Sequence, residues 1–341
     1  MCQDFGEPET LELEERPSPP CGPGRVRVRV WAAGLNYVDA LFVQGRYQIR
    51  PPTPFTPGSE LAGEVTEVGD GVDGWTVGDR VMASVGLGGF VDEIVLRPDQ
   101  LLAVPEVLDF GQAATMGQSY ATAWFTLTRR TSVGEGDRVL VLGAAGGVGL
   151  ACIDVARSLG ASVIAAASSP EKLQRCIARG AHSVIDTSSE DLKGRARELS
   201  DGGVDVVVDP VGGPLSEQAL RSLREDGRLM VVGFASGEIP QLPANQVLLR
   251  NRRVIGVDWG AWALRDPAAN ADLLREVLDR VADGTLRPVE PVTYPLAEVA
   301  TALRDLLERR VVGKAALDCA DPAPADATVG PDGPIGSDAP G

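Results

Sequence analysis

The glycines between residues 143 and 149 are the part of this sequence whose types and spacing most clearly suit a chemical task. The segment Gly143-Ala-Ala-Gly-Gly-Val-Gly149 follows the apolar run 139–142 and precedes an apolar stretch without charge until Asp154. Such a turn between a buried strand and a helix lets backbone N–H groups approach a pyrophosphate, and the helix N-terminus adds partial positive charge. Alanine replaces the first glycine of the usual fingerprint, at Ala144. The pattern predicts a dinucleotide-binding turn, with an ordinary tight turn as the alternative.

The residues after the next apolar strand favour one type of dinucleotide. NAD sites usually place an acid about twenty residues beyond the glycine turn, to bind the ribose 2′-hydroxyl. Here the strand ends without an acid and is followed by Ser168, Ser169 and Lys172, which offer hydroxyls and an ammonium to a 2′-phosphate. The alternative is that the serines and Pro170 begin a helix and that Lys172 is a surface charge. We predict NADPH in preference to NADH.

The rest of the chain supplies the elements that must position these residues. Residues up to about 115 are rich in β-strand patterns, and the segment 25–31 alternates with period two. From about residue 116 strands alternate with helices, which predicts right-handed βαβ units in a doubly wound parallel sheet. The predicted strands are 61–69, 79–83, 138–142, 162–166, 183–186, 204–208, 228–232 and 253–257, and the predicted helices are 147–159, 169–179, 214–223, 268–283 and 296–309.

Composition narrows the choice of partners. The chain has 341 residues and a formal net charge of −16, which argues against nucleic acid and anionic membranes as partners. It has no apolar run long enough to span a membrane, and its first residues lack a signal-peptide pattern. The five cysteines show no metal-ligand spacing and are interpreted as free thiols. We therefore expect a cytoplasmic protein with a small-molecule substrate.

Seven segments, in this order along the chain, together carry a family pattern. They are Ala33-Gly-Leu-Asn36-Tyr-Val-Asp39, Pro57-Gly-Ser-Glu60-Leu-Ala-Gly-Glu-Val65, Val77-Gly-Asp-Arg-Val81, Ser119-Tyr-Ala-Thr122, the glycine turn, Val232-Gly-Phe-Ala-Ser-Gly237 and Gly313-Lys314. As a set they resemble the zinc-independent branch of the medium-chain dehydrogenase/reductase superfamily, specifically the NADPH:quinone oxidoreductase (zeta-crystallin-like) family.

The resemblance implies an α/β fold with two domains and a homodimer. It implies a GroES-like β-barrel catalytic domain at 1–115 and a Rossmann NADP-binding domain, with a doubly wound parallel sheet, at 116–260. The segment 261–319 would return to the catalytic domain. The Asp/Pro/Ala/Gly-rich tail at 320–341 has almost no large apolar side chains, and we expect it to be disordered.

The same resemblance places the site residues. Zinc-dependent relatives have cysteine at the position of Asn36 and histidine at that of Ser59, so it implies a site without metal. Asn36, Tyr47 and Thr122 are the implied catalytic residues, Asn36 and Tyr47 to orient or protonate the substrate and Thr122 to face the nicotinamide. The implied cofactor-binding residues are Asn36, Thr122, Ala145, Gly146, Gly147, Val148, Ser168, Ser169, Lys172, Gly233, Phe234, Ala235 and Lys314, with Arg309 as a further candidate.

Hydride transfer without a metal suits acceptors that are already electrophilic, because no Lewis acid polarises the carbonyl. We therefore predict an NADPH-dependent reductase of quinones or α,β-unsaturated carbonyl compounds. One alternative is a reductase of enoyl thioesters on CoA or an acyl carrier. Its basic groove would have to come from the cluster Arg250, Arg252 and Arg253. An alternative of another class is an NADP-binding structural protein with little turnover.

Overall fold

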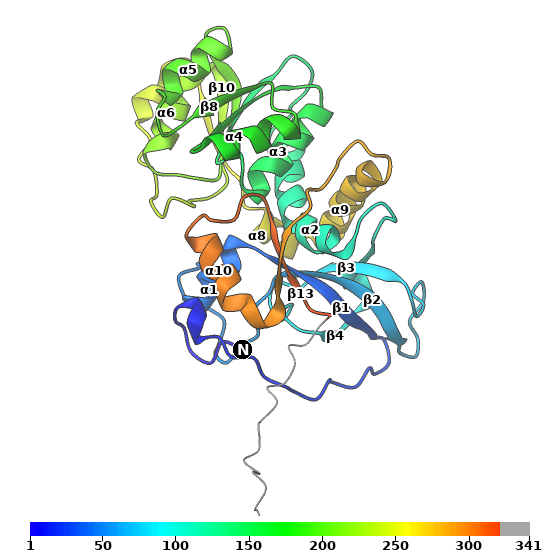
Figure 1. The fold of residues 1–341 in the computed structure, drawn as a ribbon. Helices are drawn as coiled ribbons and strands as arrows, with labels where there is room; N and C mark the ends of the chain where they lie inside the picture. Colours follow the sequence, from blue (N-terminus) through cyan, green and yellow to red (C-terminus); the bar gives the residue numbers. More distant parts are fainter. Residues whose placement is uncertain (321–341) are drawn as a thin grey trace, which may run out of the picture.

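The first and last parts of the chain share one β-sheet (Figure 1). The computed structural model describes residues 1–320, so the predicted disordered tail lies, except for Ala320, outside the described residues. The strands of this sheet are β1 (Val26–Leu35), β2 (Glu60–Val68), β3 (Arg80–Ser84), β4 (Glu93–Leu96), β5 (Leu101–Ala103), β12 (Val292–Pro295) and β13 (Ala315–Asp318). Their order is β12-β13-β1-β2-β3-β5, with β4 paired to β1. In β1, Val26, Val28 and Val30 are buried, as the period-two pattern predicts.

The second sheet is fully parallel and confirms the predicted doubly wound architecture. Its strands are β6 (Arg138–Leu142), β7 (Ser162–Ala167), β8 (Ser183–Asp186), β9 (Val204–Asp209), β10 (Leu223–Val231) and β11 (Arg253–Gly256), in the order β11-β10-β9-β6-β7-β8. The connecting helices are α3 (Gly147–Ser158), α4 (Pro170–Arg179), α5 (Leu192–Leu199) and α6 (Pro214–Ser222). The strand order reverses between β6 and β9, where such sheets bind their ligands.

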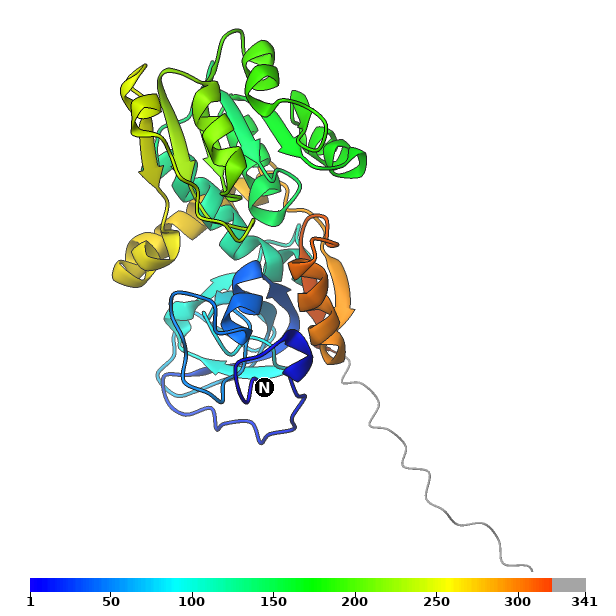
Figure 2. The ribbon, with the colours of Figure 1, turned by 90° about the vertical axis from the view of Figure 1, so that its left-hand side faces the viewer.

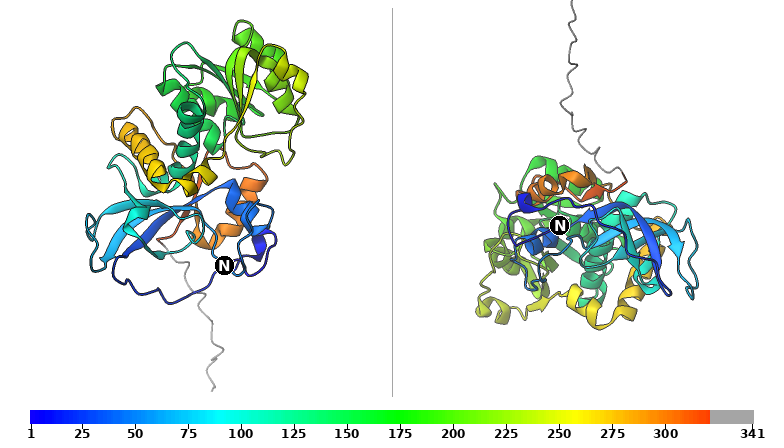
Figure 3. Two further views of the ribbon diagram at one scale, coloured as in Figure 1. Left: turned by 180° about the vertical axis from the view of Figure 1, so that it is seen from behind. Right: turned by 90° about the horizontal axis from the view of Figure 1, so that it is seen from below.

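The remaining helices fill the junction between the sheets and the sides of the molecule. They are α1 (Tyr37–Val43), α2 (Phe110–Trp124) with a π-helical extension over Phe125–Arg130, α7 (Ala244–Leu248), α8 (Trp259–Arg265), α9 (Pro267–Ala282) and α10 (Val299–Leu307). Helix α2 packs against β1 and β2 on one side and against α3 and α9 on the other. Figure 2 and the left-hand view of Figure 3 show the two sheets above and below this junction, with α10 beside the lower sheet. None of the helices within residues 1–320 is both long and apolar enough to cross a membrane.

The glycine turn forms the tight connection between β6 and α3. Gly143 has a φ of 55°, and Gly146 is the N-cap of α3. A Cβ at Gly149 would lie 2.5 Å from the carbonyl oxygen of Gly143 and 2.6 Å from the Cα of Ala144. Because both neighbours are backbone, Gly149 is what allows α3 to pack closely against the end of β6.

We expect the substitution Gly149→Ala to destabilise the protein, because the turn or the helix must move to admit the methyl group. Overpacking of this kind costs about 1–3 kcal/mol of unfolding free energy. Gly134→Ala is the matched control, since a Cβ there meets nothing within 4 Å. Urea unfolding of both variants measures the difference. Equal stabilities would contradict the assigned role of Gly149.

Candidate active site

A buried polar network joins the ends of three distant segments beside the glycine turn. The Nζ of Lys314 donates to the carboxamide oxygen of Asn36 at 2.7 Å, to Oε1 of Glu60 at 3.1 Å and to the carbonyl of Leu35 at 3.3 Å. The amide nitrogen of Asn36 donates to Glu60 Oε1 at 2.8 Å and to the hydroxyl of Ser59 at 3.2 Å. Glu60 and Lys314 are only 2% and 6% exposed. Each polar atom of the Asn36 side chain therefore has a hydrogen-bond partner.

Local sequence explains why the Asn36 side chain is free to join this network. Asn36 is the N-cap of α1, a position where an asparagine side chain usually accepts from the first turn of its helix. Here Oδ2 of Asp39 instead accepts the backbone N–H of Asn36 at 2.8 Å. This reverse contact secures the start of the helix, so the Asn36 carboxamide can turn toward Lys314.

Small residues let α2 approach the Glu60 carboxylate. A Cβ at Gly34 would lie 2.1 Å from the carbonyl of Ala114 and 2.8 Å from the Cγ of Glu60. Oε2 of Glu60 accepts the backbone N–H of Gln118 at 2.8 Å. Both oxygens of the buried carboxylate thus have donors, which buried charges require.

The Asp39 carboxyl beside this network has a strongly raised pKa. Burial raises the pKa of its carboxyl from 3.8 to about 7, and Glu60 acts in the same direction. The hydrogen bond from the backbone N–H of Asn36, the nearby Ser59 hydroxyl and the charge of Lys314 oppose the rise. Its Oδ1 atom is buried without a hydrogen-bond partner. The site therefore contains a carboxyl that changes charge near neutral pH.

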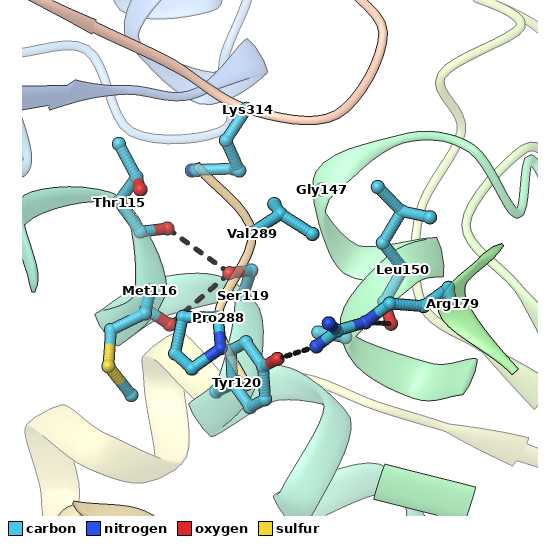
Figure 4. A pocket seen from close by; sticks show the side chains of 11 residues that line it. Thr115, Met116, Ser119, Tyr120, Gly147, Leu150, Arg179, Pro288, Val289 and Lys314 are labelled. Atoms are coloured by element: carbon cyan, nitrogen blue, oxygen red, sulfur yellow. Dashed lines mark hydrogen bonds between the residues drawn. The ribbon is translucent and has the colours of Figure 1, made fainter. Parts of the chain in front are cut away.

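Lys314 also connects this network to the glycine turn. A Cβ at Gly147 would lie 2.5 Å from the Cδ of Lys314, so the lysine stem packs directly on the first residue of α3. The preceding residue, Gly313, donates its N–H to the carbonyl of Ala145 at 2.9 Å. Lys314 and Gly147 both line a small cavity beside α2 (Figure 4). The turn and the Asn36 network therefore share one side chain.

The residues predicted to hold a 2′-phosphate lie at the start of α4. The hydroxyl of Ser169 accepts the backbone N–H of Lys172 at 3.4 Å, so this serine does cap the helix. The Lys172 ammonium donates to the carbonyl of Arg309 at 3.4 Å. The Arg309 guanidinium in turn donates to the carbonyl of Ala235 at 3.1 Å. Three predicted elements of the cofactor site, far apart in sequence, are thus side by side.

The loops after β9 and β10 run together at the carboxyl edge of the parallel sheet. The buried carboxylate of Asp209 accepts the backbone N–H groups of Val211 and Gly212, both at 2.9 Å. Its carbonyl accepts the N–H of Gly233 at 3.3 Å. Phe234 is 37% exposed at this edge. The predicted Gly233–Ala235 segment therefore lies where parallel sheets bind ligands.

Tyr47 and Thr122 are placed near the junction but outside the Asn36 network. The Tyr47 ring packs edge-on against Phe42 with 4.8 Å between centroids. Burial raises the pKa of the Tyr47 phenol, and the charge of Asp258 adds to the rise. Thr122 is half-buried on α2. Within residues 1–320 no hydrogen bond joins the side chain of Tyr47 or Thr122 to Asn36.

Two acidic residues of the site region were not assigned a role from sequence. For Glu60 the sequence does contain a signal, because this acid directly precedes the apolar residues of a predicted strand. Asp154 lies at the junction, where its Oδ2 accepts from the Tyr120 hydroxyl at 2.8 Å, the Arg179 guanidinium at 2.5 Å and the Arg287 N–H at 2.8 Å. Arg179 also donates to the Tyr120 hydroxyl (Figure 4). Asp154 therefore holds α2, α4 and the C-terminal return against α3.

Fold and site together define a medium-chain dehydrogenase/reductase. Residues 22–106 match the model of the alcohol dehydrogenase GroES-like domain, and residues 147–278 match that of the zinc-binding dehydrogenases. Quinone oxidoreductase-like protein 2 of Bos taurus is 40% identical over 93% of this chain and 91% of its own. The chain belongs to the NADPH:quinone oxidoreductase family of this superfamily, as the sequence predicts.

Solved structures agree with this assignment. The quinone oxidoreductase of Pseudomonas syringae has a TM-score of 0.83 and 33% identity, covering 93% of this chain and 98% of its own. The quinone oxidoreductase of Escherichia coli, solved with NADPH, has a TM-score of 0.82 and 28% identity over the same shares. The predicted combination of a GroES-like domain with a Rossmann-type sheet is confirmed.

We expect Asp39→Asn to change how stability depends on pH. The carboxyl has a pKa of about 7 when folded and 3.8 in its ordinary state, so the folded protein binds more protons between these values. Its contribution to the unfolding free energy therefore falls as pH rises through that window. The stability of the variant relative to wild type should grow by up to about 1.4 kcal/mol per pH unit there.

Urea unfolding at steps between about pH 4 and 7 measures this difference. Asp70→Asn, at an exposed turn residue, is the control for a general loss of negative charge. Parallel curves for wild type and Asp39→Asn would show that burial does not shift the pKa of Asp39 in this way.

Proposed function

We propose that this protein is an NADPH-dependent reductase of quinones or α,β-unsaturated carbonyl compounds that works without a metal ion. The observation that carries the proposal is the position of Lys314. Its stem packs on Gly147 of the dinucleotide turn, while its ammonium holds Asn36 and Glu60. The Lys314 side chain therefore contacts both the cofactor turn and the polar site, so the two lie next to each other, as direct transfer between cofactor and substrate requires.

The residues present fit an NADPH molecule. The backbone of Ala145, Gly146, Gly147 and Val148 would receive the pyrophosphate at the N-terminus of α3. Ser168, Ser169 and Lys172, with Arg309 beside them, would hold the 2′-phosphate. When bound, the cofactor supplies a hydride from its nicotinamide, which Thr122 and the Gly233–Ala235 segment would border.

The surroundings of Asn36 support chemistry without zinc. The Lys314 ammonium lies 2.7 Å from the Asn36 oxygen and 3.1 Å from Glu60. A zinc ion on these oxygens would face this positive charge at close range, and zinc sites instead gather Cys, His or carboxylate ligands. Within residues 1–320 no group of three or more His, Cys, Asp or Glu residues is arranged to hold a metal. Positioning and hydrogen bonding remain for the substrate, with Asn36 and Tyr47 as the proposed contacts.

We also propose a cytoplasmic homodimer. The cysteines are all free thiols, which suits a reducing compartment. Strand β11 ends the second sheet, and its Val254 is 40% exposed. An unpaired strand edge with apolar side chains is suited to pairing with a second copy of the chain.

NADPH oxidation with three acceptors tests the proposed function. We expect turnover with 9,10-phenanthrenequinone and with a simple enone, and an unchanged rate after EDTA treatment. Crotonyl-CoA as the sole effective acceptor would favour the enoyl-thioester alternative. NADPH binding without turnover on any acceptor would favour the structural alternative. Loss of activity on chelation, restored by zinc, would overturn the metal-free mechanism.

The substitution Lys172→Ala tests the cofactor preference. It removes an ammonium from the proposed 2′-phosphate site, and charge-assisted hydrogen bonds of this kind contribute about 1.5–3 kcal/mol. The Kd for NADPH should rise by roughly 10- to 150-fold, while that for NADH stays close to wild type. Lys193→Ala, at the other lysine of the nucleotide-binding half, is the matched control. Parallel losses for both cofactors, or a wild type that prefers NADH, would contradict the assignment.

A further inference from the structure

Burying the Lys314–Glu60 ion pair is energetically unfavourable for folding. Both side chains are at least nine-tenths buried, and removing two charges from water costs several kcal/mol for each ion. A pair of apolar side chains of similar volume often stabilises a protein as well or better. We therefore look for a role of these two charges other than stabilising the fold.

The pair fixes the orientation of the Asn36 carboxamide. An ammonium has only donors, so the group facing Lys314 must be the carboxamide oxygen, here 2.7 Å away. The amide nitrogen then has to face Glu60 and Ser59, which accept from it at 2.8 and 3.2 Å. A neutral side chain in place of lysine removes one of these two constraints, and the carboxamide becomes free to turn over only when Glu60 is replaced by a neutral residue as well.

The position of the ammonium is fixed as well. The Lys314 stem lies between Gly147 and the ammonium's three acceptors, so the charge is held at a set distance from the dinucleotide turn. The backbone N–H of Gln118 holds the other oxygen of Glu60. Cofactor turn, cation and carboxamide therefore form one rigid unit.

We propose that Lys314 is a positioning residue for hydride transfer. It fixes the amide of Asn36, and its ammonium, paired with Glu60, is held beside the dinucleotide turn. In the step concerned the acceptor carbon takes a hydride from the reduced nicotinamide, so one C–H bond breaks there as another forms on the acceptor. The acceptor oxygen gains the negative charge, and water then protonates it. An amide whose polar atoms are already held in one orientation does not have to reorganise as that charge develops. This inference rests on the reductase function proposed above.

A merely structural ion pair would behave differently in a paired substitution. Lys314→Met leaves Glu60 as an unpaired buried carboxylate, so loss of activity in that variant alone could follow from instability. The double variant Lys314→Met/Glu60→Gln removes both charges and keeps the side-chain volumes close to the original. A structural role predicts that this variant regains both stability and activity. A positioning role predicts that it regains stability but stays slow.

We expect the double variant to unfold at a urea concentration close to that of wild type and to have a kcat lower by roughly 10- to 100-fold. The Kd for NADPH, measured by fluorescence titration, should change by less than about threefold, because the loss is in the transition state. Recovery of wild-type kcat in the double variant would overturn the proposal. A raised Kd for NADPH with unchanged kcat would assign Lys314 to cofactor binding instead.

Chemical rescue provides a second, independent measurement. Lys314→Ala leaves space for a small alkylammonium ion, so propylammonium should restore part of kcat, and neutral propanol should not. Lys193→Ala is the control in which the amine should have no effect. Failure of the amine to raise kcat in a variant that folds and binds NADPH would overturn the proposal. Lack of turnover by wild type with every acceptor would instead be a failure of the proposed function.

Discussion

The ion pair between Lys314 and Glu60 is the contact on which the arrangement of this site depends. It joins a residue near the end of the described chain to the start of β2, and it forms beneath the first turn of α1. Because a buried charge without its partner is strongly unfavourable, the C-terminal return cannot settle elsewhere without leaving one charge unpaired. The pairing of β13 with β1 and the geometry around Asn36 therefore have a common cause.

The site also requires that backbone segments approach each other closely, which explains why glycine occurs at two of its positions. At Gly34 the backbone of α2 comes within reach of β1, so Glu60 can meet the N–H of Gln118. At Gly147 the missing side chain leaves room for the stem of Lys314. At both positions a methyl group would separate elements that must touch.

The sequence predicted most of the parallel sheet, because its strands are buried on both faces and are separated by amphipathic helices. It did not predict α2, in which residues on nearly every side are buried, so no amphipathic stripe is visible. It gave no role to Glu60, whose partners are the N-cap residue of α1, a backbone N–H of α2 and the residue before β13. Such contacts arise only when distant segments meet, and local patterns do not encode them.

The C-terminal return is held by one buried acid from each domain. Asp154 of α3 accepts the N–H of Arg287 at the beginning of this segment, and Glu60 of β2 binds Lys314 near its end. The span between these two contacts contains β12 and α10, which pack on the first sheet and on α1. Hydrogen bonds of Arg309 and Gly313 tie the same segment to the loops of the parallel sheet. Lys314 therefore lies in a segment that contacts both sheets, directly beside the carboxamide of Asn36.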